Sequence, residues 1–287
     1  PATACGLSTV KPGLGRVPAY LPSAKAERGI LAQLMSVQGA ICREVKDVRL
    51  ATQVLIGHDP RDPWHVPMPF SQPGSSLSKV GYCREAHGYP IHEGILANLD
   101  RAASILEDAG YQIQEIEIPP IAEPAKAWLQ VTNFEMKKTL EPVYKEHGSD
   151  IINQIFGCYY KLEDMVDAEG YLFGLAERTR MVREWSLLLA DYPLVLTPFL
   201  MRPGYPSNFD ETFEGVKDLF DSSIYSYGVN YLGMPAGVVP VDLVDGLPSG
   251  IQLIGQKWRE DLILDAMEVI ERATGVMTQK LWDRESD

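Results

Sequence analysis

Two short runs of this 287-residue chain bring together side chains that could do chemistry. Ser76 and Lys79 stand in an S-x-x-K spacing, in which an amine one helical turn after a serine can accept the hydroxyl proton. The run lies in a Gly/Ser-rich loop that leads into a predicted strand, and no K-T-G tract follows it. We therefore attribute this match to chance.

The second run, His58, Asp59, Asp62 and His65, places four nitrogen and oxygen ligands within eight residues. Such a set could in principle hold a zinc-like ion. Two intervening prolines keep the backbone open, and nothing directs the four side chains toward one point. The run favours a loop that ends a helix, so we expect no metal and no other cofactor.

Other catalytic patterns are missing. No G-x-S-x-G turn is present, so a classical serine triad is disfavoured, and neither G-x-G-x-x-G nor a P-loop occurs. The acidic pairs Glu163-Asp164 and Asp210-Glu211 are typical of helix caps and solvated loops. On residue chemistry alone, no complete catalytic set is present in this chain.

Composition narrows the class of protein. The chain is 45% apolar and 23% charged, which is typical of one globular domain, and its net charge of −13 disfavours a nucleic-acid partner. The longest apolar run, Ser186 to Leu200, is broken by Asp191 and Pro193, so no membrane association is expected. Four scattered cysteines and the lack of a signal-peptide pattern indicate a cytoplasmic protein with reduced thiols.

The elements that would position such groups alternate between helix and strand. Residues 1–43 are small and turn-rich, and apolar spacing then predicts a helix from Val45 that stops at Gly57. Residues 79–82 form a candidate strand. A helix over Ile95 to Leu106 and a strand that ends at Ile116-Glu117-Ile118 follow. Strand, helix and strand in this order indicate a parallel crossover.

Helical periodicity continues from residue 122 to residue 190, where we predict an insertion of three or more helices with breaks near Gly148, Gly157 and Gly170. A buried strand follows at Leu194-Val195-Leu196. Strands over 236–241 and 250–255 flank an Asp-Gly turn and predict a hairpin. A helix over 261–273 is expected to close the chain.

Six tracts, read in order, resemble the C-terminal portion of the amidase signature family. The first pairs Pro1-Ala2 and Cys5-Gly6-Leu7 with a K-P-x-x-G-R-V run, and together the six span nearly the whole chain. The run is Lys11 to Val17, and the other tracts are Gln38 to Asp47, Asp59 to Pro63, Leu196-Thr197-Pro198, Asn230 to Ala236 and Gly246 to Gly255.

The resemblance implies an α/β fold, namely a single three-layer α/β/α domain with a mixed central sheet. Residues 1–287 are expected to be the C-terminal part of this domain, which is thus N-terminally incomplete here. It also implies hydrolysis of a carboxamide to a carboxylate and ammonia or an amine. A serine nucleophile, a second serine with a cis peptide bond and a neutral lysine carry the reaction in the family. All three precede the position of Pro1, the nucleophile by about three residues. We therefore expect no catalytic residue in this chain, no activity from it alone, and an N-terminal segment as its partner.

The C-terminal part of the family helps to form the acyl pocket, which implies a substrate-binding set near Pro198 and Asn230, with ordinary packing as the alternative for each member. The candidates are Phe199, Met201, Tyr205, Tyr227, Asn230 and Tyr231. Arg16, Arg43 and Asp47 fit packing roles better. Arg43 and Asp47 stand four residues apart at a helix start, where a pair is worth only tenths of a kcal/mol.

Three functions remain open. The first is an amidase that acts on a small-molecule amide. The second is a non-catalytic amidase-like scaffold or binding protein, and the third is the amidase-like subunit of a glutamine-dependent tRNA amidotransferase, which the acidic charge disfavours. The sequence identifies neither the amide nor the oligomeric state, so whether the protein forms a homo-oligomer stays open.

Overall fold

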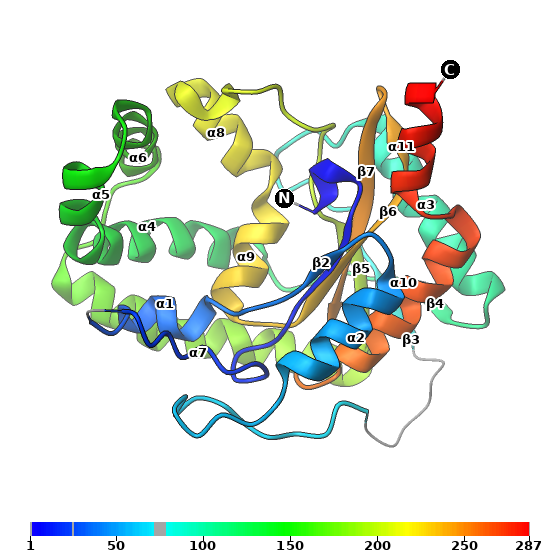
Figure 1. Ribbon diagram of the computed structural model, residues 1–287, viewed down its shortest axis with the longest axis horizontal. Helices are drawn as coiled ribbons and strands as arrows, with labels where there is room; N and C mark the ends of the chain where they lie inside the picture. Colours follow the sequence, from blue (N-terminus) through cyan, green and yellow to red (C-terminus); the bar gives the residue numbers. More distant parts are fainter. Residues whose placement is uncertain (1, 25, 72–78, 287) are drawn as a thin grey trace.

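The computed structural model describes residues 2–24, 26–71 and 79–286, and within these ranges seven strands form one mixed sheet (Figure 1). The strand order is β2-β1-β6-β7-β5-β3-β4, and helices cover both faces of the sheet. The predicted three-layer α/β/α architecture is confirmed. Ser76 lies outside the described residues, so the S-x-x-K match stays a prediction.

The parallel crossover predicted from the strand at residues 79–82 to the strand that ends near residue 118 is also confirmed. β3 pairs in parallel with both β4 and β5, whereas every other pairing is antiparallel. The strands are β1 (Ser8–Lys11), β2 (Ile41–Cys42), β3 (Lys79–Tyr82), β4 (Gln112–Glu115), β5 (Leu194–Pro198), β6 (Ala236–Val244) and β7 (Leu247–Gly255).

The centre of the sheet follows from the two strongest strand signals in the sequence. All five residues of β5 are buried, as expected for a continuous apolar run. β6 and β7 form the predicted hairpin, and each strand reaches closer to the turn than expected. Asp245 and Gly246 have φ of 52° and 76°, the backbone that an Asp-Gly hairpin turn requires.

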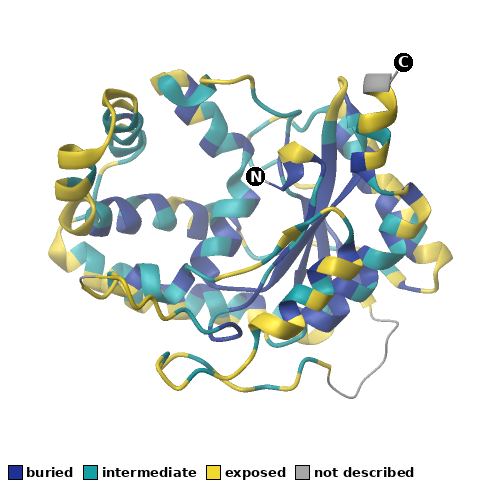
Figure 2. Cartoon of the chain, in the orientation of Figure 1, coloured by how far each residue is buried: buried dark blue, intermediate teal, exposed yellow. Residues whose placement is uncertain are grey.

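Alternation along β5 divides the core into two layers. Leu194 and Leu196 point into the cluster under α2 (Val45–Leu55), α3 (Glu93–Asp108) and α10 (Glu260–Thr274). Val195 points to the opposite face, which α1 (Ile30–Met35), α4 (Ala122–Thr139), α7 (Ala168–Asp191) and α9 (Ile224–Leu232) cover. The central strands β5, β6 and β7 are buried along most of their length, whereas the edge strands β2 and β4 are not (Figure 2).

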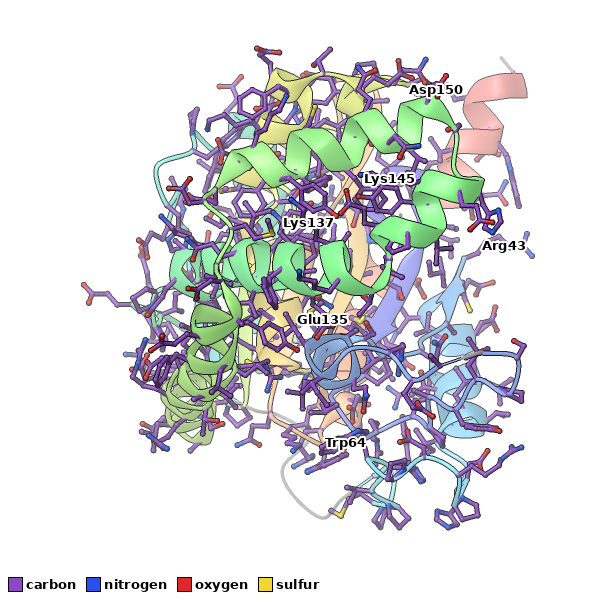
Figure 3. All side chains as sticks on the ribbon, turned by 90° about the vertical axis from the view of Figure 1, so that its left-hand side faces the viewer. Arg43, Trp64, Glu135, Lys137, Lys145 and Asp150 are labelled. Atoms are coloured by element: carbon purple, nitrogen blue, oxygen red, sulfur yellow. The ribbon has the colours of Figure 1, made fainter. Side chains whose placement is uncertain are left out.

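The helices predicted between residues 122 and 190 are α4, α5 (Glu141–His147), α6 (Asp150–Leu162) and α7, and α6 runs through Gly157 without a break. α4 packs on α7 and α9, and α6 packs on α8 (Phe213–Ser222). Buried Glu135 of α4 accepts hydrogen bonds from the first amides of α1, Leu31 N at 2.8 Å and Ala32 N at 2.9 Å (Figure 3). This carboxylate anchors a six-residue helix that has no side-chain cap of its own.

Besides the break expected near Gly157, three further expectations from the sequence were wrong. β1 lies within residues 1–43, which are mostly turn-rich; its polar side chains hide the strand because only the pairing with β2 on one side and β6 on the other makes it internal. The strand expected to end at 116–118 stops at Glu115, because Ile116 and Ile118 turn away to pack on the helical cluster. α10 does not close the chain: α11 (Met277–Ser286) follows, held by buried Met277.

Within the described ranges, no helix is long and apolar enough to cross a membrane.

Candidate active site

A cavity of about 300 Å³ lies between one face of the sheet and helices α4 and α9. Its volume is within the range of pockets that hold small organic ligands. The wall combines residues near the start of the described chain with residues of α4, α9, β6 and β7. The lining residues are Ala2, Thr3, Thr9, Lys11, Ile41, Trp128, Phe199, Ser226, Tyr227, Val229, Asn230, Ala236, Val238 and Gln252.

Three neighbouring strands form the floor. Thr9 of β1 is the register partner of Val238 of β6, and Val238 is in turn the partner of Gln252 of β7. Because directly opposed residues of paired strands point to the same face, all three side chains reach the cavity. Lys11 lies two residues further along β1, opposite Ala236, and therefore on the same face.

An aromatic wall faces this floor. The Trp128 ring of α4 lies 4.6 Å from the Tyr227 ring, centroid to centroid, and its Nε1 donates a 2.9 Å hydrogen bond to Asn230 Oδ1. Asn230 Nδ2 donates to the Met35 carbonyl at 3.3 Å. The hydroxyls of Tyr227 and Tyr159 lie 2.9 Å apart. The polar ends of these side chains are thus bonded within the protein, and their apolar faces remain for a ligand.

Lys11 is the cationic side chain of the lining. Its Nζ donates to the Met234 carbonyl at 2.9 Å. Burial and, as the smaller cause, the charge of Arg178 lower the pKa of Lys11 to about 7, although the charge of Glu260 acts in the opposite direction. A lysine with such a pKa exchanges a proton near neutral pH, so it could donate to or accept from a bound polar group.

Thr3 supplies an unused polar atom. Its Oγ1 has no hydrogen-bond partner among the described residues, and the residue is buried, with only 6% of its surface exposed. Gln252 lies across the floor and donates from Nε2 to Thr197 Oγ1 at 3.3 Å. A buried hydroxyl without a partner is costly, so Thr3 is the group in this wall most in need of a ligand atom.

Three of the six predicted substrate-binding residues, Phe199, Tyr227 and Asn230, line the cavity together. Tyr227 and Asn230 stand three apart on α9 and therefore share one face of the helix. Their role in substrate binding stays a prediction.

The other three predicted residues do not line this cavity. Met201 is fully buried in the helical cluster, where its amide donates to the Ser222 carbonyl at 2.9 Å. Tyr231, also fully buried, donates its hydroxyl to the Gly174 carbonyl at 2.9 Å. The Tyr205 hydroxyl lies against the hydroxyls of Ser222 and Ser223. These three residues are close in sequence to cavity residues, but the opposite face of α9 and the turn after β5 direct their side chains elsewhere.

The lining residues that sequence reasoning missed include Thr3, Thr9, Lys11, Trp128 and Gln252. Alternation in β1 could have placed Thr9 and Lys11 on one face had the strand been recognised. Trp128 carried no signal beyond its helical spacing. Gln252 was noticed only as part of a tract.

The run from His58 to His65 forms a loop, as predicted. Hydrogen bonds from Arg61 hold the pKa of Asp59 at about 2, and Asp62 accepts from the amide of Ala19 at 2.8 Å. The rings of His58 and His65 stack with centroids 5.3 Å apart. Within the described ranges, no group of three or more His, Cys, Asp or Glu side chains is arranged to hold a metal.

The mixed sheet, its two helical layers and the cavity against β1, β6 and β7 define an α/β enzyme-like domain, and comparison with known proteins identifies the family. The amidase family model matches residues 1–264, so the chain belongs to the amidase family. Indoleacetamide hydrolase of Bradyrhizobium japonicum is 37% identical over 287 residues, and that of Bradyrhizobium diazoefficiens is 39% identical over 288 residues.

These matches cover 99% of this chain but only 62% and 55% of the two relatives, so the chain spans less than two thirds of either length. Among solved structures, 6-aminohexanoate cyclic dimer hydrolase complexed with substrate superposes with a TM-score of 0.77. That match has 20% identity and covers 96% of this chain and 62% of the other. This structural similarity supports the fold described above.

Proposed function

We propose that the whole protein hydrolyses a small carboxamide that carries an aromatic group, and that the cavity between the sheet and α9 holds this group. The hydrolase family and the indoleacetamide hydrolase relatives support the reaction class. The aromatic wall of Trp128, Phe199 and Tyr227 supports the substrate class, because planar rings pack well against such side chains.

The observation that carries the proposal is the position of Ala2 and Thr3 in the cavity wall. By the family resemblance we expect a serine nucleophile about three residues before Pro1. An extended chain spans at most about 3.5 Å per residue, so such a serine lies within about 14 Å of Ala2. The nucleophile and the aromatic wall would then face the same space.

The chemistry follows from these positions. The serine Oγ attacks the amide carbon and forms a C–O bond, the C–N bond breaks, and the amine leaves with a proton. Water then hydrolyses the acyl-serine, which releases the carboxylic acid and restores the hydroxyl. Within this chain, the aromatic wall orients the acyl group, and Thr3 Oγ1 can bond to a polar atom of the substrate.

The first test is substrate preference. We expect the whole protein to hydrolyse indole-3-acetamide and phenylacetamide with a lower KM than acetamide. Trp128→Leu should raise KM for the two aromatic amides about tenfold or more, because a buried ring contributes roughly 1.5–3 kcal/mol, and should change acetamide little. Trp64→Leu is the matched control, since Trp64 is 45% exposed on a remote loop.

The second test locates the nucleophile. A fluorophosphonate should label one serine, and peptide mapping should place it N-terminal to Pro1. Residues 1–287 expressed alone should neither react nor hydrolyse amides. Labelling of a serine within residues 2–286, or turnover by this chain alone, would show that the catalytic group was assigned to the wrong segment.

We also propose a cytoplasmic location, which the four free cysteines Cys5, Cys42, Cys83 and Cys158 support. The alternative of a tRNA amidotransferase subunit is less well supported, because a net charge of −13 is unfavourable for contact with tRNA. Hydrolysis of free glutamine in preference to aromatic amides would favour that alternative.

A further inference from the structure

A second cavity, of about 410 Å³, lies where α7 passes the end of the sheet at which β7 stops and β6 starts (Figure 1). It shares no lining residue with the candidate active site. Its wall combines cationic, polar and apolar side chains. The lining residues are Leu14, Arg178, Val182, Ser186, Leu189, Leu232, Gly233, Met234, Gln256, Lys257 and Arg259.

Arg178 is the unusual member of this wall, because it is only 9% exposed and has no acidic partner. Its Nε donates to the Tyr231 carbonyl at 2.5 Å and its Nη2 to the Leu34 carbonyl at 3.1 Å. Among the described residues, no carboxylate lies within 4.0 Å of the guanidinium, and Nη1 forms no hydrogen bond. A buried cation of this kind is costly unless an anion pairs with it.

Lys257 adds a second positive charge without an acidic partner among the described residues, and its Nζ lies over the Trp258 ring, 4.8 Å from the centroid. Partial burial and then the charge of Arg178 lower the pKa of Lys257, which places the two cations close enough to repel each other. No carboxylate of the described chain lies within 4.0 Å of its Nζ. Arg259 differs, because it forms two hydrogen bonds to Asp261.

Arg178 differs from Arg16, the other buried arginine of the described residues, which pairs with Glu260. The chain has 39 acidic and 26 basic residues, so acidic partners are abundant. Arg180, two positions along α7, pairs with Glu123, Glu177 and Glu184. Arg49 pairs with Asp265 and Glu268. Arg178 and Lys257 instead face a cavity whose remaining wall includes the apolar side chains of Leu189 and Leu232.

We propose that this cavity binds a small organic carboxylate, whose charged group pairs with Arg178 and Lys257 and whose apolar body packs on Leu189 and Leu232. An arginine fork matches the two oxygens of a carboxylate, and a lysine adds a point charge. The guanidinium is held in place by the Tyr231 and Leu34 carbonyls. Gly233 keeps the space beside it open, since a Cβ there would lie 2.6 Å from Nη2.

Calorimetric titration of the whole protein at constant ionic strength tests this proposal without relying on amide hydrolysis. Phenylacetate is the probe, 2-phenylethanol is its neutral counterpart, and inorganic phosphate is an anion without an apolar body. We expect phenylacetate to bind at least tenfold more tightly than either. Equal binding of phosphate, or no binding of phenylacetate, would overturn the proposal.

Variants assign the binding to this cavity. Lys257→Met should weaken phenylacetate binding about tenfold, and Lys257 is exposed, so the variant keeps the fold. Arg178→Met should abolish binding, and Arg180→Met, the matched control on the same helix, should bind like the unmodified protein. If Trp128→Leu abolishes binding while Lys257→Met does not, the carboxylate occupies the first cavity and the proposal is wrong.

Discussion

Lys11 is expected to make the stability of the protein depend on pH. Its folded pKa of about 7 lies below the ordinary value of 10.5, so between these pH values the unfolded chain binds the extra proton. The free energy of unfolding of the unmodified protein should therefore rise with pH over this interval, by on the order of a few kcal/mol more than that of the Lys11→Met variant. Urea unfolding of both proteins at pH 7, 8 and 9 measures the difference. Parallel curves would contradict the shifted pKa.

Arg16 and Glu260 form a fully buried ion pair at 3.1 Å, within the K-P-x-x-G-R-V tract and at the start of α10. The two atoms are close but not aligned as a hydrogen bond, while Arg16 also donates to the Met68 and Pro69 carbonyls. We expect Glu260→Gln to cost about 3–5 kcal/mol, because it leaves a buried cation without its anion. Denaturant unfolding measures the cost. The double variant Arg16→Met/Glu260→Met should recover part of the loss, and no recovery would mean that the carbonyl contacts of Arg16 dominate.

At the scale of single elements, two glycines in long helices should respond oppositely to alanine. Gly157 in α6 has open space where a Cβ would be, so Gly157→Ala should stabilise the protein by about 0.5–1 kcal/mol through helix propensity. Gly174 in α7 is the matched control, because its Cβ would lie 2.6 Å from Val131 Cγ2. Gly174→Ala should therefore destabilise. Thermal unfolding measures the stability change of each variant. A change of the same sign in both variants would contradict this packing of α7 on α4.

Helix α1 depends on a carboxylate from another helix. Glu135 accepts from the amides of Leu31 and Ala32, and Figure 3 places Glu135 on the side of α4 that faces α1. Glu135→Gln removes the charge and one acceptor, so we expect a loss of about 1–3 kcal/mol. Lys137→Gln, an exposed change on the same helix, should stay within about 0.5 kcal/mol. Equal effects in chemical denaturation would show that α1 is held by its apolar contacts instead.

For the whole molecule, tyrosine burial predicts abrupt alkaline unfolding. Burial raises the pKa of ten of the thirteen tyrosines, namely Tyr82, Tyr89, Tyr111, Tyr159, Tyr160, Tyr171, Tyr205, Tyr225, Tyr227 and Tyr231. Above pH 10 the folded chain holds protons that the unfolded chain releases, so stability falls as pH rises. Tyrosinate absorbance and far-UV circular dichroism should change together in one cooperative step. Smooth ionisation near pH 10 without unfolding would contradict the burial of these hydroxyls.

The sequence by itself determined the elements with strong local periodicity. The apolar run of β5, the Asp-Gly hairpin of β6 and β7, and the spacing of α2, α3 and α10 all reflect which face of one segment avoids water. The ordered tracts were sufficient to indicate the family. Weakly apolar segments such as β1 and α11 were not predicted, because their burial depends on partners far along the chain.

Only the tertiary structure decided which polar residues meet. Thr3 and Gln252 are 249 positions apart in the numbering, yet both line one cavity, since the 3-10 turn Thr3–Cys5 packs against β6 and β7. Neighbours on one helix also separate: Asn230 reaches the cavity, whereas Tyr231 turns to α7. Local periodicity specifies a face for each element. The pairing of faces depends on strand order and helix packing, and these arise from long-range contacts that no local pattern encodes.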